Sequence, residues 1–306
     1  MFRPLCTAAL ALCCGTAMAA PVSVLDDEDR TVSLPAPARR IVSLAPHTTE
    51  LLFDAGAGER LVATVRYGDY PEAAKKLPVV GDAHLLDLER IAALRPDLIV
   101  VWMHGSAAAQ IDKLRALKIP IFQSEPRNLP QIGDSLRRLG VLAGTDAAAK
   151  AAADAYDAEL AGLRQRYSQR PPLRVFYQVW HQPLLTVNDK HLISDVVRLC
   201  GGVNVFGSHP TYVPAVSAEA VIAARPQVLA TSTLDGQVDD SIAHWRGFKA
   251  FEPIARGAVV TIPSDHISRH TPRILLGMQR LCDGLEQVRA GQPVSLPAAP
   301  SPRSKP

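Results

Sequence analysis

The sequence has few aromatic residues and little net charge. Aromatic side chains make up 5% of the 306 residues, and 33 basic residues against 30 acidic ones give a formal net charge of +3. A nucleic-acid-binding surface needs clustered positive charge, often interleaved with aromatic rings, so this composition argues against a nucleic-acid partner. The chain is nevertheless 47% hydrophobic, which predicts a globular protein with enough apolar residues for two cores.

The sequence also lacks common signatures of catalysis. It contains no Gly-x-Ser-x-Gly, no His-Glu-x-x-His and no Gly-x-x-x-x-Gly-Lys, and no Gly-x-Gly-x-x-Gly follows its first predicted strand. We therefore predict a protein that is not an enzyme. The alternative from another class is a secreted metal-dependent hydrolase, which needs several histidine or carboxylate ligands around an open metal position.

Residues 1–19 have the pattern of a signal peptide. One positive charge at Arg3 precedes an apolar core at residues 5–14, which is too short to span a bilayer, and Ala17 and Ala19 supply a small-x-small cleavage site. We expect cleavage after Ala19 and export to the periplasm. A membrane anchor or lipoprotein fits less well, because neither Cys13 nor Cys14 follows the small residue that lipid attachment requires.

Cysteine is scarce once that segment is removed. Of five cysteines, only Cys200 and Cys282 lie beyond it. In an oxidising compartment such a pair suggests a disulfide within the second half of the chain, and two separate buried thiols are the alternative. A bridge that closes a loop of about eighty residues would stabilise the fold by on the order of 4 kcal/mol.

One short sequence motif occurs twice in the chain. Leu88-Glu-Arg-Ile-Ala-Ala-Leu-Arg-Pro is echoed by Ala218-Glu-Ala-Val-Ile-Ala-Ala-Arg-Pro, and an apolar run follows each copy. Each copy predicts a short helix with an acid in its first turn, ended by the Arg-Pro pair and followed by a buried parallel strand. The repetition predicts two similar lobes with a ligand cleft between them.

Predicted strands and helices alternate along the rest of the chain. Residues 22–34 predict a hairpin, Thr48 is expected to cap a helix, and strands are predicted at 61–65, 97–102, 119–123, 173–180 and 259–262. Residues 145–167 are rich in alanine and contain no proline, which predicts one long, stiff helix. The predicted fold class is α/β, with two lobes that each have a central, mostly parallel sheet flanked by helices, joined by one long rigid helix.

These elements suggest five segments. We expect a signal peptide at 1–19, an N-terminal lobe at 20–144, a linking helix at 145–168, a C-terminal lobe at 169–290 and a disordered tail, rich in proline and serine, at 291–306.

Seven of the nine histidines fall in predicted turns: 47, 84, 104, 181, 209, 266 and 270. Surface loops tolerate histidine, which is the simplest interpretation of each one. As a group they favour a ligand with a metal or with hydrogen-bonding groups, because neutral imidazole binds both. His266 and His270 have the spacing of a helical metal pair, but Pro272 predicts that a helix begins after them, so we place both in a loop.

The same predicted loop contains Asp265 and Arg269, while Tyr67 and Trp102 fall at strand ends in the first half. An Arg/Asp pair with planar aromatic rings suits a large, partly apolar ligand with amide or carboxylate edges. For Trp102, packing in the core is the alternative interpretation.

Several motifs together resemble the periplasmic substrate-binding proteins of metal-chelate importers, and most closely their cobalamin-binding members. The resemblance covers nearly the whole chain after the signal segment. It rests on Arg40-Ile-Val-Ser-Leu-Ala-Pro-His-Thr-Thr-Glu50, Tyr67-Gly-Asp-Tyr-Pro71, Leu88-Glu-Arg-Ile91, Cys200-Gly-Gly-Val-Asn204, Val216-Ser-Ala-Glu219 and Ser264-Asp-His-Ile-Ser-Arg-His-Thr-Pro-Arg273.

The resemblance implies roles for individual residues. In this family, acids that match Glu89 and Glu219 project from the two lobe tips and pair with arginines of the transporter's membrane subunits, an arrangement that suits a two-fold partner. The helix dipole alone also favours a glutamate at a helix start. Matching positions imply a disulfide between Cys200 and Cys282. The implied ligand contacts are Tyr67, Trp102, Asp265 and Arg269, to which we add His47 and His266 as candidates.

The sequence departs from the cobalamin binders at three positions. Ala83 and Val213 stand where those proteins have large aromatic residues, and His266 replaces a third. His266 is therefore the candidate to face the metal of a corrinoid, a haem or another chelate. We expect a monomer without an intrinsic cofactor that captures cobalamin or a related corrinoid and delivers it to the membrane permease dimer of an ABC importer. Haem or a ferric siderophore is the alternative ligand.

Overall fold

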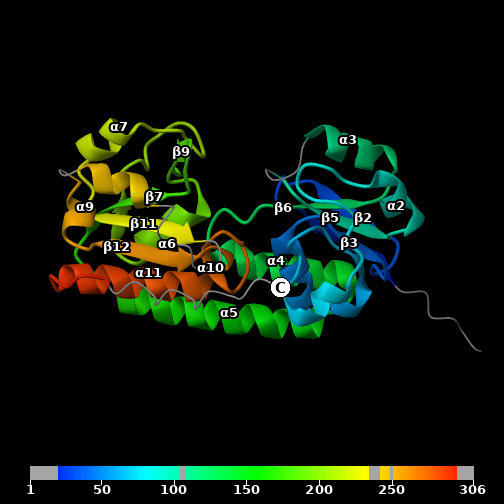
Figure 1. Ribbon diagram of the computed structural model, residues 1–306. Helices are drawn as coiled ribbons and strands as arrows, with labels where there is room; N and C mark the ends of the chain where they lie inside the picture. The colour runs from blue at the N-terminus through cyan, green and yellow to red at the C-terminus, as the bar shows by residue number, and fades with distance from the viewer. Residues whose placement is uncertain (1–19, 104–107, 168, 234–241, 249–250, 295–306) are drawn as a thin grey trace, which may run out of the picture.

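The computed structural model describes residues 20–103, 108–167, 169–233, 242–248 and 251–294. Two lobes stand side by side above one long helix, α5 (Asp146–Tyr167), which runs beneath both of them (Figure 1). Its 22 residues span about 33 Å at 1.5 Å per residue. Within the described residues, no helix combines the length and apolar character that crossing a membrane requires.

A four-stranded parallel sheet forms the centre of the N-terminal lobe. Its order is β4-β3-β5-β6, with β3 (Ile41–Ser43), β4 (Leu61–Ala63), β5 (Leu98–Trp102) and β6 (Ile121–Ser124). The helices of this lobe are α1 (Pro46–Asp54), α2 (Leu88–Ala93), α3 (Ala108–Ala116) and α4 (Pro130–Ala143), with short 3-10 turns η1 (Gly58–Arg60) and η2 (Glu72–Lys76). The predicted hairpin is present as β1 (Val22–Leu25) and β2 (Thr31–Leu34), which pair antiparallel.

The C-terminal lobe repeats this plan. Its parallel sheet has the order β10-β7-β11-β12, with β7 (Leu173–Gln178), β10 (Gly202–Asn204), β11 (Val228–Thr233) and β12 (Val259–Pro263). Around it lie α6 (Leu192–Leu199), α7 (Ala218–Ala223), α9 (Glu252–Ala255), α10 (Ser264–Ile267), α11 (Ile274–Arg289) and the 3-10 turn η3 (Ala243–Gly247). The short strands β8 (Trp180–His181) and β9 (Leu184–Leu185) form a separate antiparallel pair.

The sequence repeat occupies equivalent places in the two lobes. The units α2–β5 and α7–β11 each supply the third strand of their sheet. Arg95 and Arg225, the residues before the two prolines, both have φ of 45°. The left-handed conformation is unusual for a residue other than glycine, so the two copies share this backbone feature as well as their sequence.

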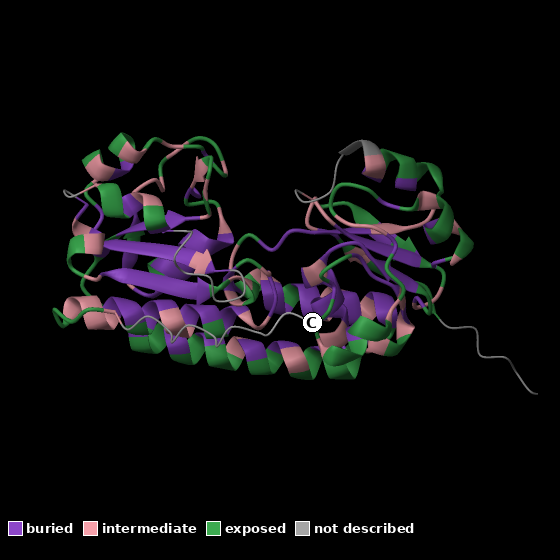
Figure 2. Cartoon of the chain, viewed as in Figure 1, coloured by how far each residue is buried: buried purple, intermediate pink, exposed green. Residues whose placement is uncertain are grey.

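The lobes share one apolar core at their base. Side chains of β5 alternate between two clusters: Leu98 and Val100 face the core that contains α4 and α5, and Ile99 and Val101 face a core with α2 and α3. The core that contains α4 and α5 continues beneath the sheet of the C-terminal lobe. On its other face, this sheet packs against a separate core around Trp245. Figure 2 shows α5 buried along its upper side and exposed along its lower side. This continuous base gives the two lobes a common support.

The structure contains the disulfide between Cys200 and Cys282, which joins the end of α6 to α11. Two local predictions were wrong. Thr48 does not cap its helix: α1 begins at Pro46, and the Thr48 hydroxyl donates to the Ala45 carbonyl from inside the first turn. His266 lies in the short helix α10 and not in a loop, because a helical turn forms immediately after β12, before Pro272.

Candidate ligand site between the lobes

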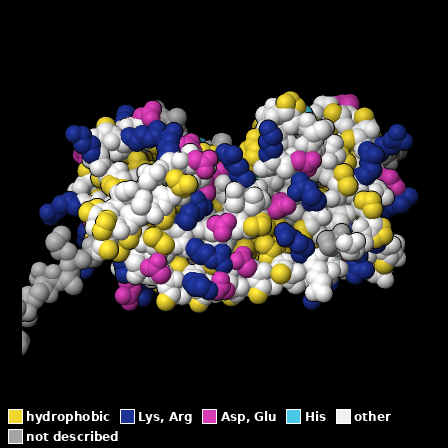
Figure 3. Space-filling model, turned by 180° about the vertical axis from the view of Figure 1, so that it is seen from behind, with side chains coloured by type: hydrophobic (Ala, Val, Ile, Leu, Met, Phe, Trp, Pro, Cys, Tyr) yellow, Lys and Arg dark blue, Asp and Glu magenta, His cyan; other side chains and the backbone are white. Residues whose placement is uncertain are grey.

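The lobes meet above α5 at a junction made of four segments. These are the first turns of α1, the loop after β4, the end of β5 and the stretch from α10 to the start of α11. In a space-filling view from behind, the outline of the molecule dips between the lobes on the side away from α5 (Figure 3). The sequence-predicted ligand residues fall on these four segments.

A charged cluster, which we define as Glu50, Asp69, Asp265, Arg269 and Arg273, joins the two lobes. Glu50 lies on α1 and its side chain is 1% exposed. One of its oxygens accepts from Arg269 Nη1 and from Arg273 Nη2, each at 2.6 Å. The other accepts from Arg273 Nε at 2.9 Å and from the Thr271 hydroxyl at 3.0 Å. Both arginines belong to the opposite lobe, so one buried carboxylate bridges the junction.

Arg269 makes two further ion pairs at the edge of this cluster. Its Nη2 lies 3.0 Å from Asp265 Oδ1, and 3.3 Å from Asp69 Oδ1 on the loop after β4. The structure thus brings the predicted pair Asp265 and Arg269 together. Their roles toward a ligand stay predictions.

The loop after β4 contains Tyr67, the most exposed aromatic residue at the junction. Tyr67 is 68% exposed and has φ of 66°. Gly68 next to it is packed so closely that an added Cβ would lie 2.0 Å from the Thr64 hydroxyl. Two residues further on, the ring of Tyr70 lies 3.7 Å beneath the Arg273 guanidinium, a cation–π contact between the lobes.

A further carboxylate, Asp54, lies near Glu50 on α1. Burial, and to a smaller extent the negative charge of Glu50, raise the pKa of Asp54 to about 6. Removing a carboxylate from water and placing it near a like charge both disfavour its ionised form. Asp54 is therefore mostly ionised at pH 7 and takes up a proton as the pH falls through about 6.

A neutral cluster, which we define as His47, Trp102 and His270, lies beside the charged one. The His47 ring is 5.5 Å from the Trp102 ring and 5.8 Å from the His270 ring, and Trp102 and His270 are 6.3 Å apart. His47 comes from α1 and is 5% exposed, while His270 comes from the opposite lobe and is 4% exposed. The rings of His191 and Tyr212 continue this cluster into the C-terminal lobe.

Both buried imidazoles are held in their uncharged form. Burial holds the pKa of His47 well below its usual value, with a smaller contribution from His270. Burial also lowers the pKa of His270 to about 4, although a hydrogen bond to the Pro126 backbone opposes the shift. Desolvation penalises the imidazolium ion, so both rings are neutral at pH 7.

Three nitrogens of the neutral cluster are buried without a hydrogen-bond partner among the described residues: His47 Nε2, Trp102 Nε1 and His270 Nδ1. Buried polar atoms are usually paired, and unpaired ones mark places where water or a ligand group can bind. For Trp102 this observation favours a polar role in addition to core packing.

The other predicted residues are more dispersed. His266 is partly buried, and its pKa is lowered by burial and then by the positive charge of Arg273. His84, Ala83 and Val213 are exposed, and His181 and His209 are partly buried. His104 lies outside the described residues. Only His47 and His270 of the seven turn histidines lie close together in the contacts described.

Several residues in or beside the junction were not among the sequence-predicted site residues. Glu50 is a buried acid on the buried side of α1, Arg273 follows Pro272 at the start of α11, and His191 was not in a predicted turn. In the sequence, the available signal was the position of Glu50 directly before the apolar residues 51–53 of a predicted helix, because an acid buried with such residues requires a partner. Which cation supplies it depends on how the lobes pack.

In the part of the chain that the structure describes, no group of three or more histidine, cysteine, aspartate or glutamate side chains is arranged to hold a metal ion. A metal-dependent hydrolase would need such a group.

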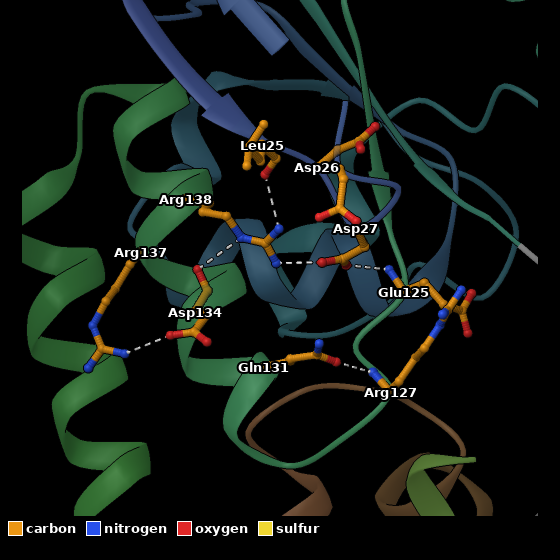
Figure 4. A pocket seen from close by; sticks show the side chains of 10 residues that line it. Leu25, Asp26, Asp27, Glu125, Arg127, Gln131, Asp134, Arg137 and Arg138 are labelled. Carbon is orange, nitrogen blue, oxygen red and sulfur yellow. Dashed lines mark hydrogen bonds and ion pairs between the residues drawn. The ribbon is translucent and has the colours of Figure 1, made fainter. Parts of the chain in front are cut away.

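A separate hollow of about 570 Å³ lies on the N-terminal lobe, between the β1–β2 turn and α4 (Figure 4). Two arginines that line it form ion pairs: Arg138 pairs with Asp27 at 2.6 Å, and Arg137 pairs with Asp154 and Asp157 on α5. These pairs connect parts of the N-terminal lobe and join it to α5, and they include no residue of the charged or neutral cluster.

The fold and the junction define a class of two-lobed binding proteins, and the sequence comparisons agree. Residues 41–266 match the model of the periplasmic binding protein family. The chain belongs to this family.

Particular relatives narrow the comparison. The chain is 40% identical over 258 residues to the vitamin B12-binding protein of Yersinia pestis (strain Pestoides F), covering 84% of this chain and 90% of that one. The same values hold for the vitamin B12-binding protein of Yersinia pseudotuberculosis serotype O:1b (strain IP 31758).

Solved structures of periplasmic binding proteins share the fold of this chain. The periplasmic vitamin B12-binding protein BtuF of Vibrio cholerae superposes with a TM-score of 0.76 at 35% identity, covering 83% of this chain and 98% of that one. The periplasmic heme-binding protein RhuT of Roseiflexus sp. RS-1 superposes with a TM-score of 0.69 over 83% of this chain and all of that one. At 23% identity, the second likeness concerns the fold alone.

Proposed function

We propose that this protein captures cobalamin, or a related corrinoid, between its lobes in the periplasm and delivers it unchanged to the membrane permease dimer of an ABC importer. The observation that carries the proposal is the 40% identity over 84% of the chain with vitamin B12-binding proteins. The two-lobed fold shared with the Vibrio cholerae protein supports it.

The chemistry of the junction suits such a ligand. A corrinoid is a large ring with apolar faces and amide groups at its edge, so it needs an aromatic surface, hydrogen-bond donors and acceptors. Tyr67 supplies an exposed ring, and Asp265 and Arg269 supply an acceptor and donors. The unpartnered nitrogens of His47 and Trp102 add polar groups that carry no charge.

His266 is the candidate contact to the metal of the ligand. Its pKa is lowered, so its imidazole is neutral at pH 7 and offers a lone pair. We propose that it faces the cobalt of a corrinoid whose axial position is exchangeable. Titration with aquocobalamin then shifts the visible absorption bands, and His266→Ala abolishes the shift but leaves binding of cyanocobalamin intact.

Direct titration tests the ligand. The purified protein is titrated by calorimetry with cyanocobalamin, haemin and Zn²⁺ in parallel, and visible spectra are recorded. We expect saturable binding of one cyanocobalamin per chain. Binding of haemin without binding of cyanocobalamin would mean that the ligand is haem and not a corrinoid. Hydrolysis of a substrate that depends on Zn²⁺ would mean that the protein is a hydrolase and not a carrier.

We further propose that Glu89 and Glu219 dock the protein on the permease dimer. Both are exposed in the first turn of equivalent helices, α2 and α7, which lie in the part of each lobe that faces away from α5 (Figure 1). The double variant Glu89→Ala/Glu219→Ala should bind cyanocobalamin normally but lose uptake in vesicles that contain the importer. The control is Glu159→Ala, an exposed glutamate on α5. Normal uptake by the double variant would contradict the docking role.

A further inference from the structure

The loop that contains Tyr67 is attached to the opposite lobe through two arginines. Asp69 of the loop pairs with Arg269, and the ring of Tyr70 stacks beneath Arg273. Both arginines in turn converge on Glu50. Contacts thus run from the loop of the N-terminal lobe to two side chains of the C-terminal lobe, and from these back to α1 of the N-terminal lobe.

Glu50 is the member of this chain of contacts on which both arginines depend. The side chains of Arg269 and Arg273 are only 12% and 15% exposed, and an arginine in a protein does not lose its proton. Both guanidinium groups contact the same Glu50 oxygen, so they would repel each other if the carboxylate were absent. A buried charge that loses its partner is strongly destabilising.

The remaining acids do not take the place of Glu50. Within the described residues, Asp69 and Asp265 form ion pairs with Arg269 alone, and their side chains are 52% and 53% exposed. Water and salt screen such exposed pairs, which contribute little on their own. Among the described residues, Glu50 is the one acid that forms an ion pair with Arg273.

We propose that Glu50 is a positioning residue: through Arg269 and Arg273 it holds the loop of residues 67–71 in its ligand-facing conformation and fixes the separation of the two lobes. The left-handed conformation of Tyr67 agrees with this role, because a residue other than glycine keeps such a backbone only where its surroundings hold it. The part of this inference that concerns ligand affinity rests on the proposed function, but the part that concerns lobe separation does not.

The test compares Glu50→Gln with a matched control. Gln keeps the size of the side chain and removes its charge. The control is Asp27→Asn, which removes a carboxylate that is 7% exposed and pairs with Arg138 at 2.6 Å within the N-terminal lobe. Both variants lose a buried ion pair, so both lose stability, but only Glu50→Gln removes one that joins the lobes.

Lobe separation is measured without any ligand. Spin labels are attached at Ala93→Cys and Ala223→Cys, two exposed positions that end the equivalent helices α2 and α7. We expect one narrow distance distribution in the unsubstituted background and in Asp27→Asn, and a broader one in Glu50→Gln. An unchanged distribution in Glu50→Gln would overturn the role in lobe separation.

Ligand affinity is measured in the same proteins with cyanocobalamin. We expect Glu50→Gln to weaken binding about tenfold and Asp27→Asn to change it less than about twofold. Wild-type affinity in Glu50→Gln would overturn the role in positioning the loop. If no variant, nor the wild type, binds a corrinoid, the proposed function fails while the distance measurement still decides the role in lobe separation.

A second variant covers the case in which Glu50→Gln does not fold. Tyr70 is 41% exposed, so Tyr70→Leu removes the stack on Arg273 without disturbing a buried charge. We expect it to fold and to weaken cyanocobalamin binding about threefold. Unchanged affinity in Tyr70→Leu would contradict the connection between Arg273 and the loop.

Discussion

The base and the junction connect the same two lobes by different interactions. At the base, apolar side chains from both lobes and from α5 form one continuous core that includes Leu136, Leu160 and Leu281. At the junction, the lobes meet through the Glu50 carboxylate and through neutral imidazoles. Apolar burial is non-directional and tolerates small shifts, whereas buried polar groups require defined partners. The base therefore provides stability, and the junction provides one defined arrangement for binding.

Removal of the disulfide should have the largest effect on the free energy of unfolding, and it should weaken only the base. The bridge closes a loop of 82 residues, for which the chain-entropy model gives about 4.5 kcal/mol. The double variant Cys200→Ala/Cys282→Ala should lose about that free energy of unfolding in urea. Its affinity for cyanocobalamin at temperatures where it stays folded should be unchanged, because the bridge lies within the C-terminal lobe. A clear loss of affinity would show that base and junction are coupled.

Truncation of Glu50 should have the next largest effect, at the junction. Glu50→Ala leaves Arg269 and Arg273 buried without their shared partner, which costs about 4 kcal/mol of unfolding free energy. Urea denaturation measures the loss. The control Glu59→Ala removes an exposed glutamate and should change stability by less than about 0.5 kcal/mol. Equal losses in the two variants would mean that the charged cluster contributes no more than a surface pair.

Acidification should weaken the junction through its imidazoles. The pKa of His270 is about 4 in the folded protein, against 6.5 for an ordinary histidine. As pH falls below 6.5 the unfolded chain binds the proton first, so stability is lost between pH 6.5 and 4, by about 3 kcal/mol for this group. His47 has a lowered pKa and adds to the loss.

The variant His270→Gln isolates this effect. Its unfolding free energy should fall less steeply with acid than that of the wild type, while His84→Gln, at an exposed position, should follow the wild type. The partly buried carboxyl of Asp54 has its pKa raised to about 6, so its contribution to the pH dependence has the opposite sign and is common to all three proteins. If the unfolding free energies of His270→Gln and the wild type depended on pH in the same way, the lowered pKa of His270 would be contradicted.

Substitution of Trp102 should have the smallest effect on stability. Trp102→Phe removes a buried N–H without a partner among the described residues and keeps an aromatic ring, so the unfolding free energy should change by less than about 1 kcal/mol. If the indole N–H binds the ligand, cyanocobalamin affinity should fall about fivefold. Unchanged affinity would mean that Trp102 serves only in packing.

Much of the fold could be predicted from local patterns. The repeated motif, which begins near a glutamate and ends in Arg-Pro, predicted the units α2–β5 and α7–β11. The alanine-rich stretch without proline predicted α5. Such features depend on neighbouring residues, through helix propensity and the restriction before proline, so they are visible in the sequence. Thr48 shows the limit of this reasoning, because Pro46 starts the helix earlier and the hydroxyl bonds within it.

The candidate site was predictable only in part. Tyr67 and Trp102 were predicted from their strand-end positions, Asp265 and Arg269 from their shared loop, and all four from the family resemblance. Their contact with a ligand stays a prediction. Nothing local relates Glu50 to Arg269 and Arg273, which lie more than 200 positions away. The neutral cluster likewise combines His47 with His270, and the sequence patterns placed His270 in a surface loop although it is 4% exposed.

The sequence by itself determined the composition of two apolar cores, the repeated α/β unit, the long helix and the one cysteine pair that lies after residue 19. These depend on periodicity and on short-range backbone chemistry, which adjacent residues specify. Only the tertiary structure decided which charges and imidazoles meet at the junction. Their pairing depends on how two separately built lobes rest on α5, and burial then determines which carboxylate bridges two cations and which imidazoles stay neutral.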